Sequence, residues 1–270
     1  MRFKPTILLQ DESDLHLPRV LCLHGGGTNA RIFHAQCRGI LKHLHREFRF
    51  VFAQAPFPSV AGPDVLSVYK EWGPFRRWLE SPPDDSEFPS QQTVIELDRA
   101  LEDAMHRDTM RGATGNWVGV MGFSQGAKLA ASLLYRQQEG LSKTNFRFGI
   151  LLAGSAPLAI LDQDWDLQAI FKSLPKSRHP DAVLSIPTIH VHGCRDAGLH
   201  RHRQLYKSCQ QDTARLVEWD GNHRVPIKSK DLLPLVQQIR EVSQDAHYGG
   251  TSFSVPLDFK PSVSCLEVEV

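Results

Sequence analysis

Short apolar runs alternate along this 270-residue chain with segments whose apolar positions recur at helical spacing. Residues 19–23 and 118–121 are strand-like runs, and each leads into a glycine-rich turn. Val94, Leu97, Leu101 and Ala104 lie three or four residues apart and predict a helix of three or four turns. Further strands are expected at residues 48–53, 146–152, 186–192 and 215–219, and further helices at 30–45, 125–138, 202–211 and 231–244. Strands that alternate with helices predict an α/β fold, with a mainly parallel central sheet and helices on both faces.

Two segments interrupt this alternation. Residues 56–92 are rich in proline, glycine and aromatic residues and are long for a connection inside a compact domain, so they predict a functional insertion. Residues 155–185 form a second excursion, in which a short helix is expected at 167–174. We expect one domain over residues 1–247, followed by a tail at 248–270 whose role the pattern does not indicate.

The strongest chemical signal is the pentapeptide Gly122-Phe123-Ser124-Gln125-Gly126. A G-x-S-x-G motif between a strand and a helix is typical of a nucleophile elbow, in which a strained backbone thrusts the serine hydroxyl above the sheet. The pentapeptide alone also occurs by chance as an ordinary glycine-rich turn. Here a buried-type strand precedes it and an apolar helix follows it, so we predict that Ser124 is a nucleophile.

A serine nucleophile needs a base, and the base needs an acid that holds it in the correct tautomer. Asp196 lies in the loop after the strand expected at 186–192, and His223 lies in the loop after the strand expected at 215–219. This order of serine, acid and histidine predicts a Ser124–His223–Asp196 triad. Asp220 is the alternative acid, although its closeness to His223 is more typical of a turn residue. The alternative bases, in helical or tail segments, are His200, His202 and His247.

Acyl transfer also requires donors for the oxyanion that forms on the carbonyl oxygen. The backbone N–H of Gln125 is expected to be one donor. The glycine run after His24 is expected to supply the other, with Gly26 as first choice and Gly27 as second. A phosphate-binding loop is the alternative for this run, but neither G-x-G-x-x-G nor a Walker motif is present.

Charge and composition narrow the classes of partner. The net charge is +1, so global charge favours neither nucleic acid nor a membrane surface, and we predict no nucleic-acid or membrane partner. No apolar stretch approaches the length of a membrane span or a signal peptide. The five scattered cysteines indicate reduced thiols in a cytoplasmic protein. His190 and His192 alternate on a strand and could bind metal, but hydrogen-bonded histidines fit better, so we predict no metal and no cofactor.

Around these residues the chain resembles the fungal serine hydrolases related to the yeast FSH proteins, and most closely the members encoded beside polyketide synthases. The matching segments are LCLHGGGTNARIF (21–33), FAQAPFPSVAGPDV (52–65), GPFRRWL (73–79), GFSQGA (122–127), HVHGCRD (190–196) and GNHRVP, which ends at Pro226. The resemblance implies an α/β-hydrolase fold and a stand-alone thioesterase or esterase that releases a polyketide from an acyl carrier domain or rescues a stalled synthase. It carries the triad onto Ser124, Asp196 and His223. Many relatives have glycine where this chain has Asn222, a departure that leaves the chemistry intact.

The insertion is the expected wall of a pocket for a hydrophobic acyl group, because such pockets are lined mostly by apolar and aromatic side chains. Its aromatic residues, expected to bind substrate, are Phe57, Tyr69, Trp72, Phe75 and Trp78, with Phe88 beyond them. The alternative is that they only close a satellite core beneath a long loop. Two other functions stay open: an esterase, lactonase or C–C bond hydrolase acting on a free small molecule, and a ligand-binding protein without catalysis.

Basic residues gather after the expected acid. Arg195, Arg201 and Arg203, together with Arg76 and Arg77 of the insertion, suggest a docking patch for an acidic carrier domain or the phosphate of its arm. A solvated loop and helix start is the alternative.

Overall fold

The central sheet has six strands in the order β2-β1-β5-β6-β7-β8, and every neighbouring pair is parallel. The computed structural model describes residues 14–63, 65–80, 89–161 and 184–245. The strands are β1 (Arg19–Leu23), β2 (Arg49–Ala53), β5 (Trp117–Phe123), β6 (Phe148–Leu152), β7 (Thr188–Gly193) and β8 (Ala214–Trp219). They coincide within a few residues with the six predicted strands.

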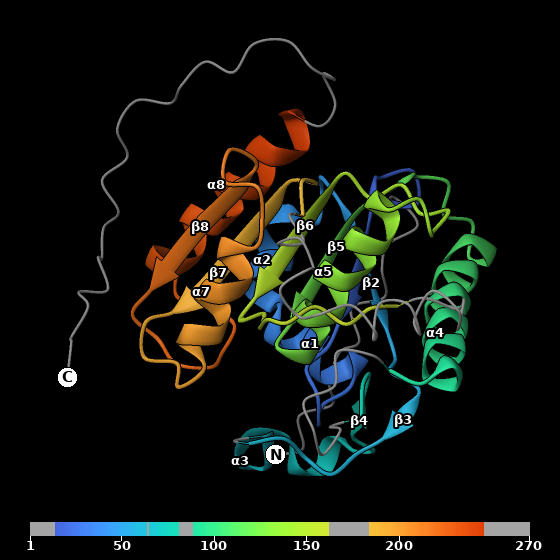
Figure 1. The fold of residues 1–270 in the computed structure, drawn as a ribbon, viewed down its shortest axis with the longest axis horizontal. Helices are drawn as coiled ribbons and strands as arrows, with labels where there is room; N and C mark the ends of the chain where they lie inside the picture. Colours follow the sequence, from blue (N-terminus) through green and yellow to red (C-terminus); the bar gives the residue numbers. More distant parts are fainter. Residues whose placement is uncertain (1–13, 64, 81–88, 162–183, 246–270) are drawn as a thin grey trace, which may run out of the picture.

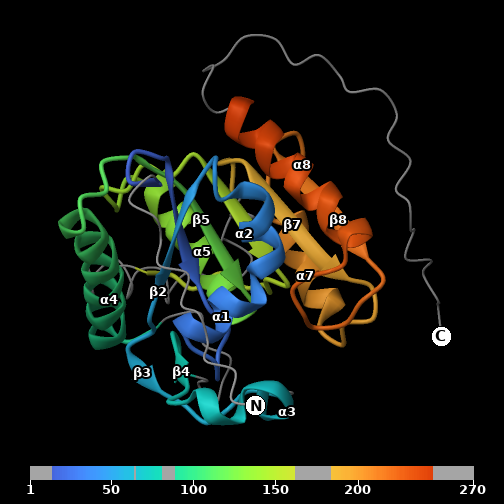
Figure 2. The ribbon, with the colours of Figure 1, turned by 180° about the vertical axis from the view of Figure 1, so that it is seen from behind.

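Helices cover both faces of this sheet (Figures 1 and 2). One face carries α4 (Gln91–Met110), α5 (Gln125–Gln138) and α7 (Leu199–Lys207) over one buried apolar cluster. The other carries α1 (Ala30–Gln36), α2 (Arg38–Leu44) and α8 (Ser229–Asp245) over a second cluster. The predicted α/β-hydrolase architecture is therefore confirmed.

Three helices differ from the prediction, among them α7, which spans Leu199–Lys207 where a helix was expected at 202–211. The segment expected as one helix at 30–45 is divided at Cys37, which has ψ of 4° and ends α1 before α2 begins. The helix around Leu97 is longer than predicted, at 20 residues, because its polar first and last turns lack the apolar period. It begins after Ser90, whose hydroxyl accepts a hydrogen bond from the N–H of Thr93 at 3.1 Å, as an N-cap does.

The insertion has its own small elements. β3 (Phe57–Pro58) and β4 (Arg76–Arg77) pair in an antiparallel ribbon, and α3 (Val65–Tyr69) and the 3₁₀ turn η2 (Lys70–Trp72) lie between them in the chain. In Figure 1 these elements lie together beyond the end of the central sheet where β1 leads into α1. The helix expected at 167–174, the aromatic Phe88 and the tail at 248–270 fall outside the described residues.

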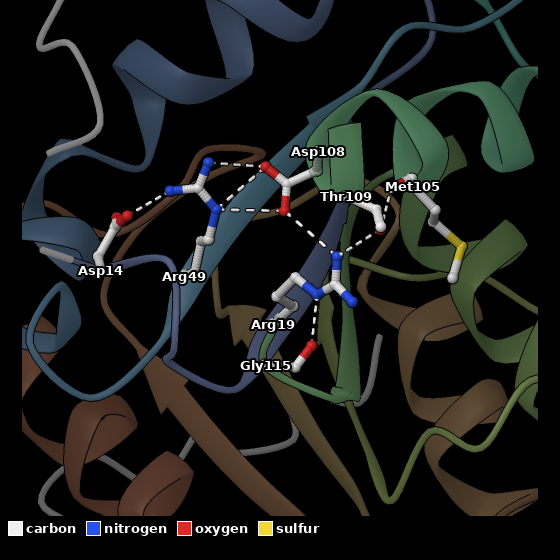
Figure 3. Close-up of polar contacts among 7 residues, drawn as sticks. All are labelled: Asp14, Arg19, Arg49, Met105, Asp108, Thr109 and Gly115. Carbon is white, nitrogen blue, oxygen red and sulfur yellow. Dashed lines mark hydrogen bonds and ion pairs between the residues drawn. The ribbon is translucent and has the colours of Figure 1, made fainter. Parts of the chain in front are cut away.

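A buried ionic cluster fixes the opposite, amino end of the sheet (Figure 3). Asp108, near the end of α4, accepts from Nη2 of Arg49 on β2 at 2.7 Å and lies 3.6 Å from Nη1 of Arg19 on β1. Asp14 contacts the same Arg49 guanidinium. A buried charge left without its partner typically costs about 3–5 kcal/mol, so these contacts lock α4 onto β1 and β2.

The described cysteines differ in their oxidation state. Cys22, Cys37 and Cys209 are free and buried, as expected. Cys194 is disulfide-bonded, which corrects the expectation of reduced thiols throughout. Among the described helices, none combines the length and the apolar character that a bilayer span requires.

Candidate active site

Ser124 sits in a strained turn between β5 and α5. Its φ of 54° and ψ of −117° lie in a region that residues with a side chain rarely adopt. The flanking glycines are required because a side chain at either position would collide with the backbone. A Cβ on Gly122 would lie 2.1 Å from the carbonyl oxygen of Gly126, and a Cβ on Gly126 would lie 2.1 Å from the carbonyl oxygen of Leu23. The local geometry is thus that of a nucleophile elbow.

The structure brings Ser124, His223 and Asp196 together from three separate loops. Nε2 of His223 lies 2.9 Å from Oγ of Ser124, and Nδ1 of His223 lies 2.6 Å from Oδ2 of Asp196. The loops follow β5, β7 and β8, whose carboxyl ends meet at one edge of the parallel sheet. This continuous chain of contacts can pass a proton from the serine hydroxyl to the imidazole while the carboxylate fixes the tautomer.

The surroundings of the two acid candidates separate them. Asp196 is buried, and its second oxygen, Oδ1, accepts a hydrogen bond from the N–H of Gly198 at 2.8 Å. Asp220 is exposed and pairs instead with Nε of Arg195 at 2.9 Å. The carboxylate that contacts the imidazole is therefore that of Asp196.

The two expected oxyanion donors lie close together at the elbow. Among the described residues, the backbone N–H groups of Gly26 and Gln125 have no hydrogen-bond acceptor, whereas that of Gly27 donates to the carbonyl of Arg76 at 2.9 Å. A Cβ built on Gly26 would lie 3.2 Å from the side-chain oxygen of Gln125, so the two segments are adjacent. Gly26 is thus available for an oxyanion, and Gly27 is not.

The family model described as "Serine hydrolase (FSH1)" matches residues 14–234. The chain belongs to this family. Similar relatives are the esterase claE of Penicillium crustosum, 53% identical over 87% of this chain and 96% of its own length, and the esterase citA of Monascus ruber, 53% identical over 86% and 94%. A second Monascus ruber protein, the esterase pigG, is 50% identical over 87% of this chain and 94% of its own. The predicted family and the predicted class of enzyme, a serine hydrolase, are confirmed.

Solved structures support the fold of this serine hydrolase. The maize acyl-protein thioesterase 2 matches with a TM-score of 0.52 at 16% identity, covering 84% of this chain and 94% of that one. A carboxylesterase from Mesorhizobium loti matches with a TM-score of 0.51 at 17% identity, covering 83% and 88%. At such identities the likeness concerns the fold alone.

His24 shapes the loop that carries Gly26. Its Nε2 accepts the N–H of Ala55 at 3.1 Å, which leaves its proton on Nδ1, 2.9 Å from the carbonyl oxygen of Gly25. Burial lowers the pKa of His24 to about 4, so this tautomer persists at neutral pH. The hydroxyl of Thr28 also donates to the Gly25 carbonyl, at 2.6 Å. These bonds fix the backbone from which the oxyanion donor projects.

The insertion is fastened to the same loop. The carbonyl oxygens of Gly27 and Thr28 accept the N–H groups of Gly62 and Arg76 at 2.9 and 2.7 Å. Asn29 donates from its side chain to the carbonyl of Trp72 at 2.6 Å. The insertion therefore lies directly beside the expected oxyanion donor.

The expected substrate-binding aromatics have two different environments. Phe57, Tyr69, Trp72 and Phe75 are half-buried, and the rings of Tyr69 and Trp72 meet edge to face at 5.2 Å. Trp78 has no exposed surface. Its indole N–H donates to the carbonyl of His24 at 2.8 Å. The structure thus corrects the expectation for Trp78, which is a core residue beneath the oxyanion loop.

Three further histidines form a row behind Asp196. The ring centroids of His190 and His192 are 6.0 Å apart, and those of His192 and His202 are 5.6 Å apart. The ring centroid of His202 is in turn 5.9 Å from that of His223. Burial lowers the pKa to about 3 for His190, about 3 for His192 and about 4 for His202. His190 contacts Oγ1 of Thr188 at 3.1 Å, as expected, but both ring nitrogens of His192 lack a partner among the described residues, contrary to the expectation.

Among the described residues, neither His200 nor His202 forms a hydrogen bond with Ser124. His202 is buried, with Nδ1 3.9 Å from Oδ2 of Asp196, and His200 is exposed on the same helix. His247 is outside the described residues. The sequence pattern did not indicate that His202 would lie beside Asp196, because a helix was expected from residue 202 onward, whereas α7 begins at Leu199, directly after the turn at Gly198.

Proposed function

We propose that this serine hydrolase cleaves a carboxylic ester or thioester of a hydrophobic acyl group through an acyl-enzyme on Ser124. The observation that carries the proposal is the unbroken contact chain from Oγ of Ser124 through His223 to the buried carboxylate of Asp196. The adjacent N–H groups of Gly26 and Gln125, which have no acceptor within the described part of the chain, add the donors that acyl transfer requires.

In the first half-reaction, Oγ of Ser124 attacks the acyl carbon while Nε2 of His223 takes the hydroxyl proton. The charge that develops on the carbonyl oxygen is held by the N–H groups of Gly26 and Gln125. The C–O or C–S bond then breaks, and His223 returns its proton to the departing alcohol or thiol. Asp196 stays ionised throughout and stabilises the imidazolium.

In the second half-reaction, water attacks the acyl-enzyme and gives a proton to His223. Breaking the bond to Oγ releases the carboxylic acid, and the proton returns to Ser124. Every step uses side chains and backbone groups of this chain together with water, so the chemistry proposed here calls on no cofactor.

The relatives named as esterases, about half identical to this chain over most of its length, support an ester substrate. The resemblance to family members encoded beside polyketide synthases favours a polyketide-derived acyl group. We propose that the insertion forms one wall of its pocket and that the half-buried Trp72 and Phe75 contribute to it, because the carbonyl of Trp72 is bonded to Asn29 and the N–H of Arg76, next to Phe75, is bonded to Thr28. A protein with this alignment of nucleophile, base and acid is better suited to catalysis than to ligand binding alone.

A more specific proposal is that an acyl carrier domain delivers the substrate. The ion pairs around the site weaken the case for it. Arg195 pairs with Asp220, and Arg203 lies 3.3 Å from Glu218, so neither presents a full charge to an acidic partner. Arg201 is exposed and has no ion-pair partner among the described residues. We therefore favour a substrate that binds through its acyl group, with any carrier contact centred on Arg201.

Labelling with a fluorophosphonate and turnover of a p-nitrophenyl acyl ester test the proposal. Ser124→Ala should abolish labelling and lower kcat by roughly 10⁴-fold to 10⁶-fold. Ser243→Ala is the matched control, because among the described residues its hydroxyl bonds only the carbonyl of Arg240 within α8. Labelling that survives in Ser124→Ala, or more than a few per cent of the original turnover, would refute Ser124 as nucleophile.

A further inference from the structure

Asp196, His202 and His223 present three ligand atoms to one small region behind the nucleophile. The three atoms all lie within 4.8 Å of one another. Nδ1 of His202 is 3.9 Å from Oδ2 of Asp196, and Nδ1 of His223 is 2.6 Å from the same oxygen. Two imidazoles and a carboxylate are a ligand set that zinc uses in proteins.

His202 lies beside the triad but takes no part in the proposed hydrolysis. Its side chain is buried, 2% exposed as a residue, and Nδ1 has no hydrogen-bond partner among the described residues. A buried polar atom without a partner costs free energy, so its orientation toward Asp196 calls for an explanation. Nδ1 of His202 is therefore the atom that a bound cation would engage.

We propose that Asp196, His202 and His223 form an inhibitory site for zinc or a similar divalent cation. In a tetrahedral zinc site with bonds of about 2.0–2.1 Å, neighbouring ligand atoms lie roughly 3.4 Å apart. The 3.9 Å gap from His202 to Asp196 is close to that spacing, whereas the 2.6 Å contact of His223 with Asp196 must open. His223 can make this movement because its side chain is 45% exposed, and the same exposure gives the ion access and leaves a fourth position for water.

Metal binding at Nδ1 of His223 would switch off the base through its tautomer, a consequence that rests on the proposed function. In the triad, neutral His223 carries its proton on Nδ1 and accepts from Ser124 at Nε2. Occupation of Nδ1 by the cation moves that proton to Nε2, with no change in the number of protons on the ring. The Nε2–H group then points toward Oγ of Ser124 and can no longer take its proton.

The site is tested first by inhibition. Ester hydrolysis is measured against zinc chloride in a buffer that does not chelate the metal, with each variant's zinc-free rate as its own reference. Zinc should inhibit the wild-type protein reversibly, with activity restored by EDTA. His202→Gln should raise the half-inhibitory zinc concentration at least tenfold. His200→Gln, an exposed histidine on the same helix, should leave it unchanged.

Cobalt supplies a readout that does not depend on activity. Titration of Co²⁺ into Ser124→Ala protein should produce the visible bands of a tetrahedral cobalt centre, and adding His202→Gln should remove them. Absence of these bands in Ser124→Ala overturns the site, even if His202→Gln fails to fold. Equal zinc inhibition of the wild type and His202→Gln also overturns it. Bands without inhibition would support the site and count against His223 as the catalytic base.

Discussion

The side chain of Gln125 holds the backbone of Trp78. Its Oε1 accepts the N–H of Trp78 at 2.7 Å, and its Nε2 donates to the carbonyl of Leu79 at 3.0 Å. Gln125 also begins α5 directly after Ser124, and its own N–H is an expected oxyanion donor that has no acceptor among the described residues. Gln125 thus connects the nucleophile elbow to the end of the insertion. Trp78 makes a second connection, because its indole N–H donates to the carbonyl of His24.

This relationship predicts different effects for the two tryptophans of the insertion. Trp78→Ala should lower the free energy of unfolding by about 3–5 kcal/mol, because a fully buried ring is removed. Trp72→Ala should change stability little and should raise KM for octanoyl esters more than for acetyl esters. Urea denaturation and p-nitrophenyl esters of two chain lengths measure both effects. Equal stability losses with unchanged chain-length preference would contradict the proposed wall at Trp72.

The positions of the strands and the loop positions of the triad could be predicted from the sequence because they depend on local signals, whereas the order of the strands in the sheet was not predicted. The strand before Ser124 and the helix after it both have strong apolar patterns, and the loops of Asp196 and His223 follow strands of the same kind. The division of the first helical segment at Cys37 was not predictable in this way, since apolar residues continue on both sides of the break. The burial of Trp78 could not be predicted from the hydrophobic pattern either, because an aromatic residue in a long loop suits a pocket and a core equally well.

Asp196→Asn should retain the local geometry and favour the wrong imidazole tautomer, lowering kcat by roughly 10³-fold to 10⁴-fold. Asp220→Asn removes only an exposed pair with Arg195, so kcat should change by less than about threefold. Steady-state kinetics with one ester measure both variants. A larger loss in Asp220→Asn than in Asp196→Asn would show that the acid had been misassigned.

His192 makes stability depend on pH. Burial lowers its pKa from 6.5 to about 3, so the unfolded chain binds a proton that the folded protein refuses between those values. Its contribution to stability is complete above pH 6.5 and is lost progressively as the pH falls toward 3. His192→Phe should therefore raise the free energy of unfolding by about 1 kcal/mol at pH 7, where it removes two unpaired nitrogens, and by roughly 2 kcal/mol more at pH 5.

Urea denaturation at the two pH values measures this difference. His106→Phe is the matched control, since His106 is exposed on α4 and should not alter the pH dependence. A loss of stability at both pH values would show that the phenyl ring does not fit, and Leu then replaces Phe in the same measurement. An unchanged pH dependence in both variants would refute the role of His192.

The hydrogen-bond partners of the buried histidines could not be predicted from the sequence. His190 and His192 were recognisable as a pair on one strand, but a partner for each nitrogen depends on neighbours that the sequence does not place. Thr188 supplies one for His190, two positions earlier on the same strand. His202 comes from α7, and its approach to Asp196 results from the turn at Gly198, where a Cβ would lie 3.1 Å from Nε2 of His202.

Substitution of Arg201 tests whether a carrier domain docks beside the site. Arg201 lies on the exposed side of α7, which begins just after the loop of Asp196, whereas Arg203 and Arg195 are paired with acidic side chains. If a carrier domain uses this surface, Arg201→Glu should lower kcat/KM at least tenfold for a carrier-bound thioester, and the loss should shrink as salt rises. The same variant should leave a small diffusible thioester within about twofold. Lys207→Glu, at the far end of α7, serves as the charge-matched control and should affect neither substrate. Equal losses on both thioesters, or none on either, would contradict docking at Arg201 and would favour a free substrate recognised through its acyl group.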